Sequence, residues 1–91
     1  MATEIALPGN TWTKIGNNLS EMSWQNAGQI PFYINFTATD VAPTDDVGFI
    51  YSTFDDEIKR TLTGVTYVAT PLYVWAKPVT GKTGKVIVET P

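Results

Sequence analysis

The stretch Ile30-Pro31-Phe32-Tyr33-Ile34-Asn35-Phe36-Thr37-Ala38 decides the fold class. Its even-numbered positions are all apolar, whereas its odd-numbered positions are proline, tyrosine, asparagine and threonine. Alternation with a period of two over this length is typical of a β-strand that buries one face. Pro31 has no amide hydrogen to donate, so we expect this end of the strand at a sheet edge or just outside the ladder.

The same test predicts further strands on both sides of this segment. The better patterned ones are 47–52, 72–77 and 85–89, and the weaker ones are 4–7, 12–15, 21–25 and 58–63. Good turn formers separate them, namely Pro8-Gly9-Asn10, Gly16-Asn17-Asn18, Asn26-Ala27-Gly28, Pro43-Thr44-Asp45-Asp46 and Gly81-Lys82-Thr83-Gly84. A helical turn over 55–60, where acids precede bases, is the less favoured alternative. About seven or eight short antiparallel strands predict an all-β fold, a single small β-sandwich or jelly-roll-like domain.

Length and composition indicate one domain with a modest core. The chain has 91 residues, no cysteine and no histidine, so disulfides and the commonest general base are absent. Stability must then come from packing, hydrogen bonds or association with other subunits. We predict that residues 11–91 form the sandwich and that residues 1–10 form an extended N-terminal arm or an edge strand.

The charge pattern argues against several classes of partner. Nine acidic residues stand against six scattered basic ones, and the pI is about 4.6, whereas nucleic-acid binders usually carry a basic stripe. No apolar run reaches about eighteen residues, and no basic leader precedes an apolar segment. We therefore expect no nucleic acid, no membrane span and no signal peptide, and synthesis in the cytoplasm.

Motifs for catalysis or metal binding are weak. Gly81-Lys82-Thr83 lacks the earlier glycine of a phosphate loop, because Ala76 occupies that position, and a strand follows it. The clusters Asp45-Asp46 and Asp55-Asp56-Glu57 lack the spacing of an EF-hand, so solvated turns are the favoured interpretation over calcium ligands. No nucleophile, base and oxyanion set is visible. We predict no enzymatic activity, no catalytic residue, no metal site and no cofactor.

Aromatic side chains are the main functional lead. Tryptophan and tyrosine are enriched at interfaces, where apolar area and a polar atom are both useful. The candidate partner-binding residues are Trp12, Trp24, Tyr33, Tyr73 and Trp75. Core packing remains the alternative for each of them. Apolar residues on both parities of 72–76 indicate that both faces of that strand are covered, which a neighbouring subunit would make easier.

Three stretches together carry a resemblance to a known class of proteins. They are Thr11-Trp12-Thr13-Lys14-Ile15, then Trp24-Gln25-Asn26-Ala27-Gly28-Gln29-Ile30-Pro31, and then Pro71-Leu72-Tyr73-Val74-Trp75-Ala76-Lys77 followed by Gly84-Lys85-Val86-Ile87-Val88-Glu89-Thr90. This order resembles small virion proteins of tailed bacteriophages, in particular capsid decoration or cement proteins. In those proteins a strand with tryptophan precedes a Gln-Asn-Gly-type turn, and an aromatic strand closes the chain through a hairpin.

The resemblance implies a function in the virion. It implies a β-sandwich subunit, often a trimer, that binds the outer surface of the major capsid protein shell and stabilises it. Its partners would be other copies of itself and the major capsid protein, and residues 2–10 could lie across a neighbouring subunit. The alternatives are a carbohydrate- or receptor-binding module of a tail fibre, with a glycan as partner, and a small tail or head–tail structural subunit.

Overall fold

The computed structural model describes residues 2–63, 65 and 71–91. This part of the chain contains eight strands joined by loops and turns, and no helix. The strands are β1 (Ala2–Leu7), β2 (Thr13–Leu19), β3 (Glu21–Asn26), β4 (Phe32–Thr37), β5 (Phe49–Tyr51), β6 (Asp56–Thr61), β7 (Leu72–Pro78) and β8 (Gly84–Glu89). The all-β prediction is confirmed, and each predicted strand has a counterpart. The alternative helical turn over 55–60 is wrong, because that segment pairs with β3 as β6. Within the described residues no helix could cross a bilayer.

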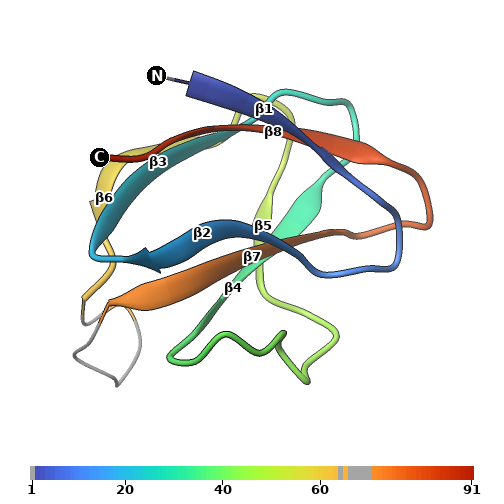
Figure 1. Ribbon diagram of the computed structural model, residues 1–91. Coiled ribbons are helices and arrows are strands. Elements are labelled where there is room, and N and C mark those ends of the chain that lie inside the picture. The colour runs from blue at the N-terminus through green and yellow to red at the C-terminus, as the bar shows by residue number, and fades with distance from the viewer. Residues whose placement is uncertain (1, 64, 66–70) are drawn as a thin grey trace.

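The strands form two four-stranded sheets that pack face to face (Figure 1). Sheet A has the order β1-β8-β3-β6 and sheet B the order β2-β7-β4-β5, with every pair antiparallel. Within these sheets β1 pairs with β8, β2 with β7, β3 with β6 and β4 with β5. Such nested pairing is that of a long hairpin rolled up into two sheets, which is the eight-stranded jelly roll.

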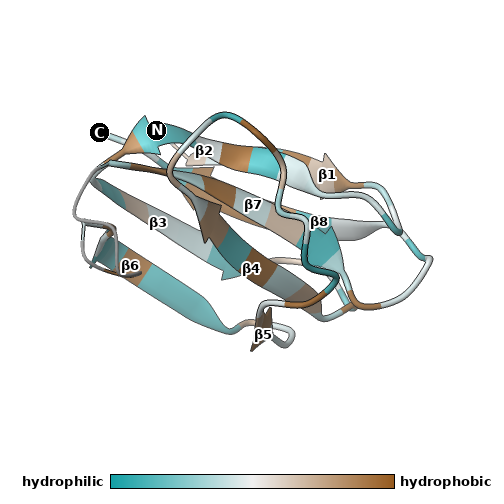
Figure 2. Ribbon diagram, turned by 90° about the horizontal axis from the view of Figure 1, so that it is seen from below, coloured by the Kyte–Doolittle hydropathy of each residue, from teal (hydrophilic) through white to brown (hydrophobic). Residues whose placement is uncertain are grey.

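The core lies between the two sheets and follows the alternation of the strands. In β7, Leu72, Val74 and Ala76 are fully buried, and in β4 Phe32 and Ile34 are. From sheet A the core receives Leu7, Met22, Trp24, Val86 and Val88. Figure 2 shows apolar segments along β7 and β4, the two central strands of sheet B. Burial of each large side chain contributes about 1.5–3 kcal/mol, so this layer supplies the main stabilisation.

The loop 38–48 crosses the outer face of sheet B. Its main-chain oxygen at Asp45 accepts from Trp12 Nε1 at 3.0 Å, and its Asp40 carboxylate pairs with Lys14 Nζ at 2.9 Å. A Cβ at Gly48 would collide with the Ile34 main chain, so glycine lets the loop return flat against β4. The chain thus covers part of this outer face with its own loop, which pairs with Lys77 of β7 through Asp46.

Candidate interaction surface

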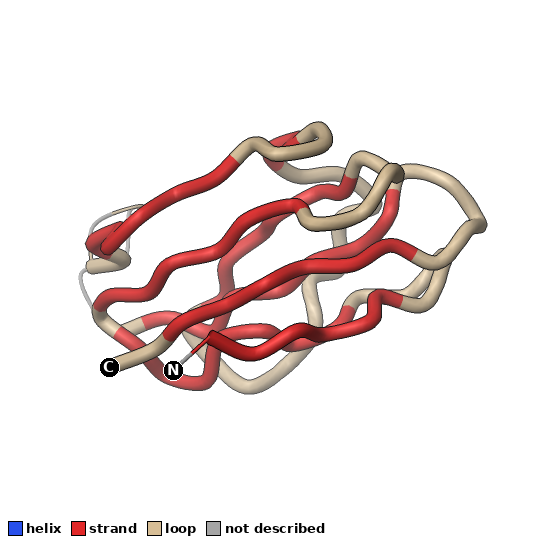
Figure 3. Tube along the Cα trace, turned by 90° about the horizontal axis from the view of Figure 1, so that it is seen from above, coloured by secondary structure: helices blue, strands red, loops and turns tan. Residues whose placement is uncertain are grey.

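Two edge strands, β5 of sheet B and β6 of sheet A, lie along the same side of the sandwich (Figures 2 and 3). Four large apolar side chains are exposed there: Phe49 by 63%, Ile50 by 60%, Phe54 by 75% and Ile58 by 68%. We call Phe49, Ile50, Phe54 and Ile58 the apolar rim. These side chains point in different directions, but all four lie on or between the two edge strands, so this side of the molecule offers apolar contact area.

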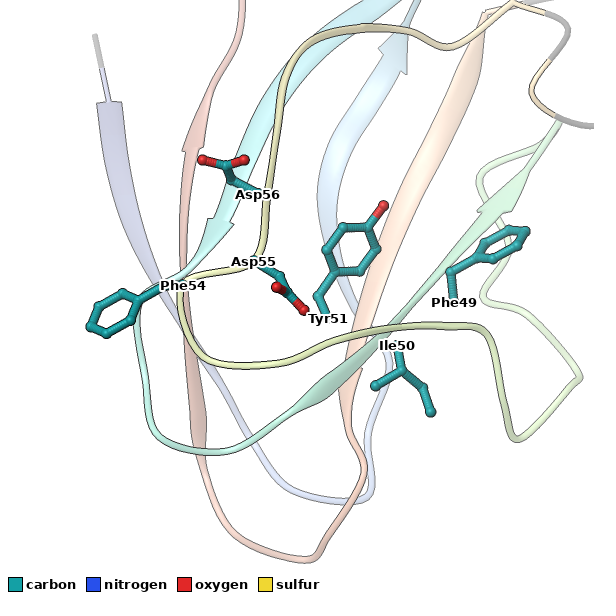
Figure 4. Close-up of a pocket in the computed structure, with 6 residues that line it drawn as sticks. All are labelled: Phe49, Ile50, Tyr51, Phe54, Asp55 and Asp56. Carbon is teal, nitrogen blue, oxygen red and sulfur yellow. The ribbon is translucent and has the colours of Figure 1, made fainter.

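A shallow hollow of about 520 Å³ lies within this side of the molecule. Its lining is Phe49, Ile50, Tyr51, Phe54, Asp55 and Asp56. Figure 4 shows Phe49 and Phe54 at opposite ends of the segment, pointing away from each other, with Asp55 between them. The Asp55 carboxylate accepts from the Ser52 amide at 2.7 Å, which closes the turn between β5 and β6. The surface is therefore apolar with an acidic centre.

The buried side chain of Asn26 holds this segment in place. Asn26 is fully buried at the end of β3, and its Nδ2 donates to the main-chain oxygens of Ile30 at 3.0 Å and Tyr51 at 2.9 Å. Its Oδ1 accepts from the Gly28 amide at 3.0 Å, and its main-chain oxygen accepts from the Phe54 amide at 2.9 Å. A buried amide with all of these partners fixes the position of the exposed segment from below.

Between β5 and β6 the sandwich opens into a cavity of about 210 Å³. Its walls are Trp24, Phe36, Phe49, Tyr51, Glu57, Arg60 and Val65. The hydroxyl of Tyr51 donates to Glu57 Oε1 at 3.1 Å. Burial, and then the charge of Glu57 and the hydrogen bond to it, raise the pKa of Tyr51 to about 12, while Arg60 acts in the opposite direction. The Tyr51 hydroxyl therefore stays protonated and keeps Glu57 directed to the mouth of the sandwich.

Trp24 supplies an unpaired donor beneath this mouth. Its side chain is 1% exposed and packs against Tyr51, edge to face at 5.8 Å, and against Phe36 at 6.3 Å. Nε1 of Trp24 is buried and has no partner at hydrogen-bonding geometry in the described part of the chain. The Tyr51 oxygen is nevertheless near enough for the indole to lower its pKa slightly. Of the five aromatic residues singled out in the sequence, Trp24 is the one in the central core.

The other four of these residues gather on the outer face of sheet B. Tyr33 lies on β4, Tyr73 and Trp75 lie on β7, and Trp12 immediately precedes β2. None of them is strongly exposed: Trp75 is 8% exposed and its Nε1 donates to Thr37 Oγ1 at 2.8 Å. Lysine ammonium groups lie over two of the rings, Lys14 over Tyr73 at 5.6 Å and Lys77 over Trp12 at 5.5 Å. The loop 38–48 ties this cluster down, so it is not an open aromatic platform.

Among residues 2–63, 65 and 71–91, no three His, Cys, Asp or Glu side chains gather as metal ligands would. The acidic side chains of the turns instead have local partners: Asp46 pairs with Lys77 at 3.7 Å, and Asp55 accepts from the Ser52 amide. This side of the molecule therefore offers an apolar contact surface with the carboxylates of Asp55 and Asp56 beside it.

Comparisons with models of known protein families, with curated proteins and with solved structures give no match. The apolar rim was not among the residues that sequence reasoning selected. A signal for it was present, because Phe49 and Ile50 are adjacent and therefore point to opposite faces of a short strand.

Proposed function

We propose that this chain is a non-enzymatic structural protein of a tailed-phage virion, which decorates the capsid by binding the outer surface of the major capsid protein shell. The observation that supports it best is the apolar rim, whose four side chains are each at least 60% exposed. A rigid sandwich with such an edge suits a protein that binds over a surface, because its contact residues are held by the fold before the partner arrives.

The chemistry of the rim defines the expected contact. Phe49, Ile50 and Phe54 provide apolar area, and Asp55 and Asp56 place negative charge between and beside them. The complementary surface on the shell is apolar with lysine or arginine at its margin. Large apolar side chains that become buried in such a contact carry most of the binding energy.

The experiment is binding to expanded, undecorated shells of the cognate major capsid protein. We expect saturable co-sedimentation at micromolar concentration and increased resistance of the particles to heat. In Phe54→Ser the affinity falls roughly tenfold, equivalent to about 1.4 kcal/mol. The matched control is Val41→Ser, since Val41 is 64% exposed but lies in the loop 38–48. Absence of binding, or equal loss in both variants, would contradict the proposal.

A second candidate function is recognition of a glycan, as in a receptor-binding module of a tail fibre. The cavity between β5 and β6 favours it, because it has aromatic walls and one side chain of each charge, Glu57 and Arg60. Opposite charges in one small cavity disfavour both anions and cations and leave a neutral polyhydroxyl ligand as the best match. Titration with a panel of monosaccharides, followed through tryptophan emission, tests this candidate. Unchanged emission throughout the panel would remove it.

A further inference from the structure

The outer edge of β6 lacks a pairing strand in the described part of the chain. β6 ends sheet A, with β3 on one side and no described strand on the other. Such an edge presents free amide and carbonyl groups that can pair with another chain. Proteins usually protect it with charges and bulges, and β6 has both. The arrangement of these charges, however, is specific.

The sequence of β6 is divided by charge. Asp56 and Glu57 are acidic, Ile58 is apolar, and Lys59 and Arg60 are basic. In an antiparallel pair of two such strands, the acidic half of one strand lies beside the basic half of the other. Opposite charges at facing positions stabilise a strand pair, and like charges destabilise it. The edge is thus complementary to itself.

A bulge in β6 determines which side chains share a face. Met22 pairs with Arg60 and Trp24 with Glu57, so Ile58 and Lys59 together oppose the single residue Ser23. The Lys59 amide donates to Ser23 Oγ at 2.8 Å, and Lys59 has a positive φ of 50°. As a result Glu57 and Arg60 both line the cavity between the sheets, whereas Ile58 and Lys59 both line the outer face of sheet A.

We infer that two copies of this chain join through their β6 strands about a two-fold axis that passes between Ile58 and Lys59. In this register Glu57 of each copy faces Arg60 of the other, on the cavity side. Ile58 faces Lys59 and Asp56 faces Thr61 on the outer side, so facing residues share a face throughout. A slip by one residue sets Glu57 against Lys59, whose side chains point to opposite faces.

The contact also closes the mouth of each sandwich. Phe49 lines the cavity there yet is 63% exposed, and a second copy at this edge covers it, which leaves Ile50 and Phe54 of the apolar rim for the proposed shell contact. Contacts of this kind are isologous, the commonest type in soluble oligomers. The inference concerns a second copy and does not depend on the capsid proposal. It differs from the trimer that the phage resemblance implies, because a two-fold contact closes with two chains.

Charge exchange tests the contact. Light scattering of the unaltered chain, across a micromolar concentration series, is expected to give the mass of two chains of 10.0 kDa each. Glu57→Arg and Arg60→Glu each place like charges face to face, so each variant alone has the mass of one chain. An equimolar mixture of the two variants regains the mass of two chains, as does the double variant that carries both changes.

Two controls separate the contact from loss of folding. Glu4→Arg makes the same change of charge as Glu57→Arg, on β1 at the opposite edge of sheet A, and leaves the mass at two chains. Recovery in the mixture shows that both single variants are folded, and the circular dichroism of Arg60→Glu checks this independently of the Tyr51–Glu57 hydrogen bond. A monomer at all concentrations, a trimer, or a dimer that persists in Glu57→Arg alone and in Arg60→Glu alone would overturn the inference.

Discussion

The side-chain amide of Asn26 donates from Nδ2 to the main-chain oxygen of Tyr51 at 2.9 Å, and this bond joins the end of β3 in one sheet to β5 in the other. The same residue bonds to Phe54 through its main chain. Through these contacts a fully buried polar side chain determines where the exposed apolar segment lies.

Replacement of Asn26 by alanine is expected to lower the free energy of unfolding by about 2–3 kcal/mol, because the part-buried main-chain oxygens of Ile30 and Tyr51 lose their donor. Urea denaturation measures this change. Asn35→Ala is the control: Asn35 Nδ2 also donates to a main-chain oxygen, that of Val47 at 3.2 Å, but near the surface. The control is expected to cost less than about 1 kcal/mol. Equal losses of stability in Asn26→Ala and Asn35→Ala would contradict the stabilising role assigned to Asn26.

The stability of the chain is expected to depend on Tyr51 in alkaline solution. The pKa of Tyr51 is raised from 10.0 to about 12 in the folded chain, so the unfolded chain ionises first. The stabilising contribution of the protonated Tyr51 hydroxyl is complete below about pH 10 and is lost as the pH rises from about 10 to about 12. Tyr51→Phe therefore loses less stability than the unaltered chain across this window. Tyr33→Phe serves as the comparison, and identical slopes for all three chains would refute the raised pKa.

Trp75 is expected to depend on Thr37 for its place on the outer face of sheet B. Thr37→Val removes the acceptor of the 2.8 Å bond from Trp75 Nε1 while keeping the shape of the side chain. The unpaired indole costs about 1–2 kcal/mol of unfolding free energy. In Trp75→Phe the donor itself is absent, so adding Thr37→Val to it costs less than in the unaltered chain. A double-mutant cycle by thermal denaturation measures the difference, and strict additivity would count against the bond.

The apolar rim is expected to contribute little to folding. Phe54 is 75% exposed, so Phe54→Ser changes the free energy of unfolding by no more than about 0.5 kcal/mol. Phe32, which is fully buried, gives the contrasting case, since removal of its ring costs about 3–5 kcal/mol. Urea midpoints compare the two variants. A large loss in Phe54→Ser would mean that the residue packs within the chain and is not available to a partner.

Local patterns in the sequence were sufficient to predict the strands. The alternation from Ile30 to Ala38 contains β4, and Phe32 and Ile34 are fully buried as that alternation requires. Turn residues such as Asn26-Ala27-Gly28 marked the ends of strands, because their side chains and backbone conformations oppose continuation of a ladder. These rules are local, and one of them is wrong here: Gly16-Asn17-Asn18, predicted as a turn, lies inside β2, where the register of its pairing with β7 shifts.

Only a small part of the interaction surface could be predicted from local patterns, namely the adjacent apolar pair Phe49-Ile50. Which strands end a sheet is set by the order of pairing, so the exposure of Phe49 and Ile58 follows from the topology. The loop that lies over the outer face of sheet B is distant in sequence from Trp12, to which its Asp45 main-chain oxygen bonds. Tryptophan is a residue type common at interfaces, but the side chain of Trp24 on β3 faces the core and is buried.

The nested order of the strand pairs has a consequence for the route by which the chain folds. β4 and β5 are separated by one loop, whereas β1 and β8 stand at opposite ends of the chain and still pair from Ala2 with Glu89 to Leu7 with Gly84. Each outer pair spans all the inner ones, and closing such long loops slows folding, to milliseconds or longer in β-sandwiches. During synthesis, β1 therefore has no strand to pair with in sheet A until β8 has left the ribosome.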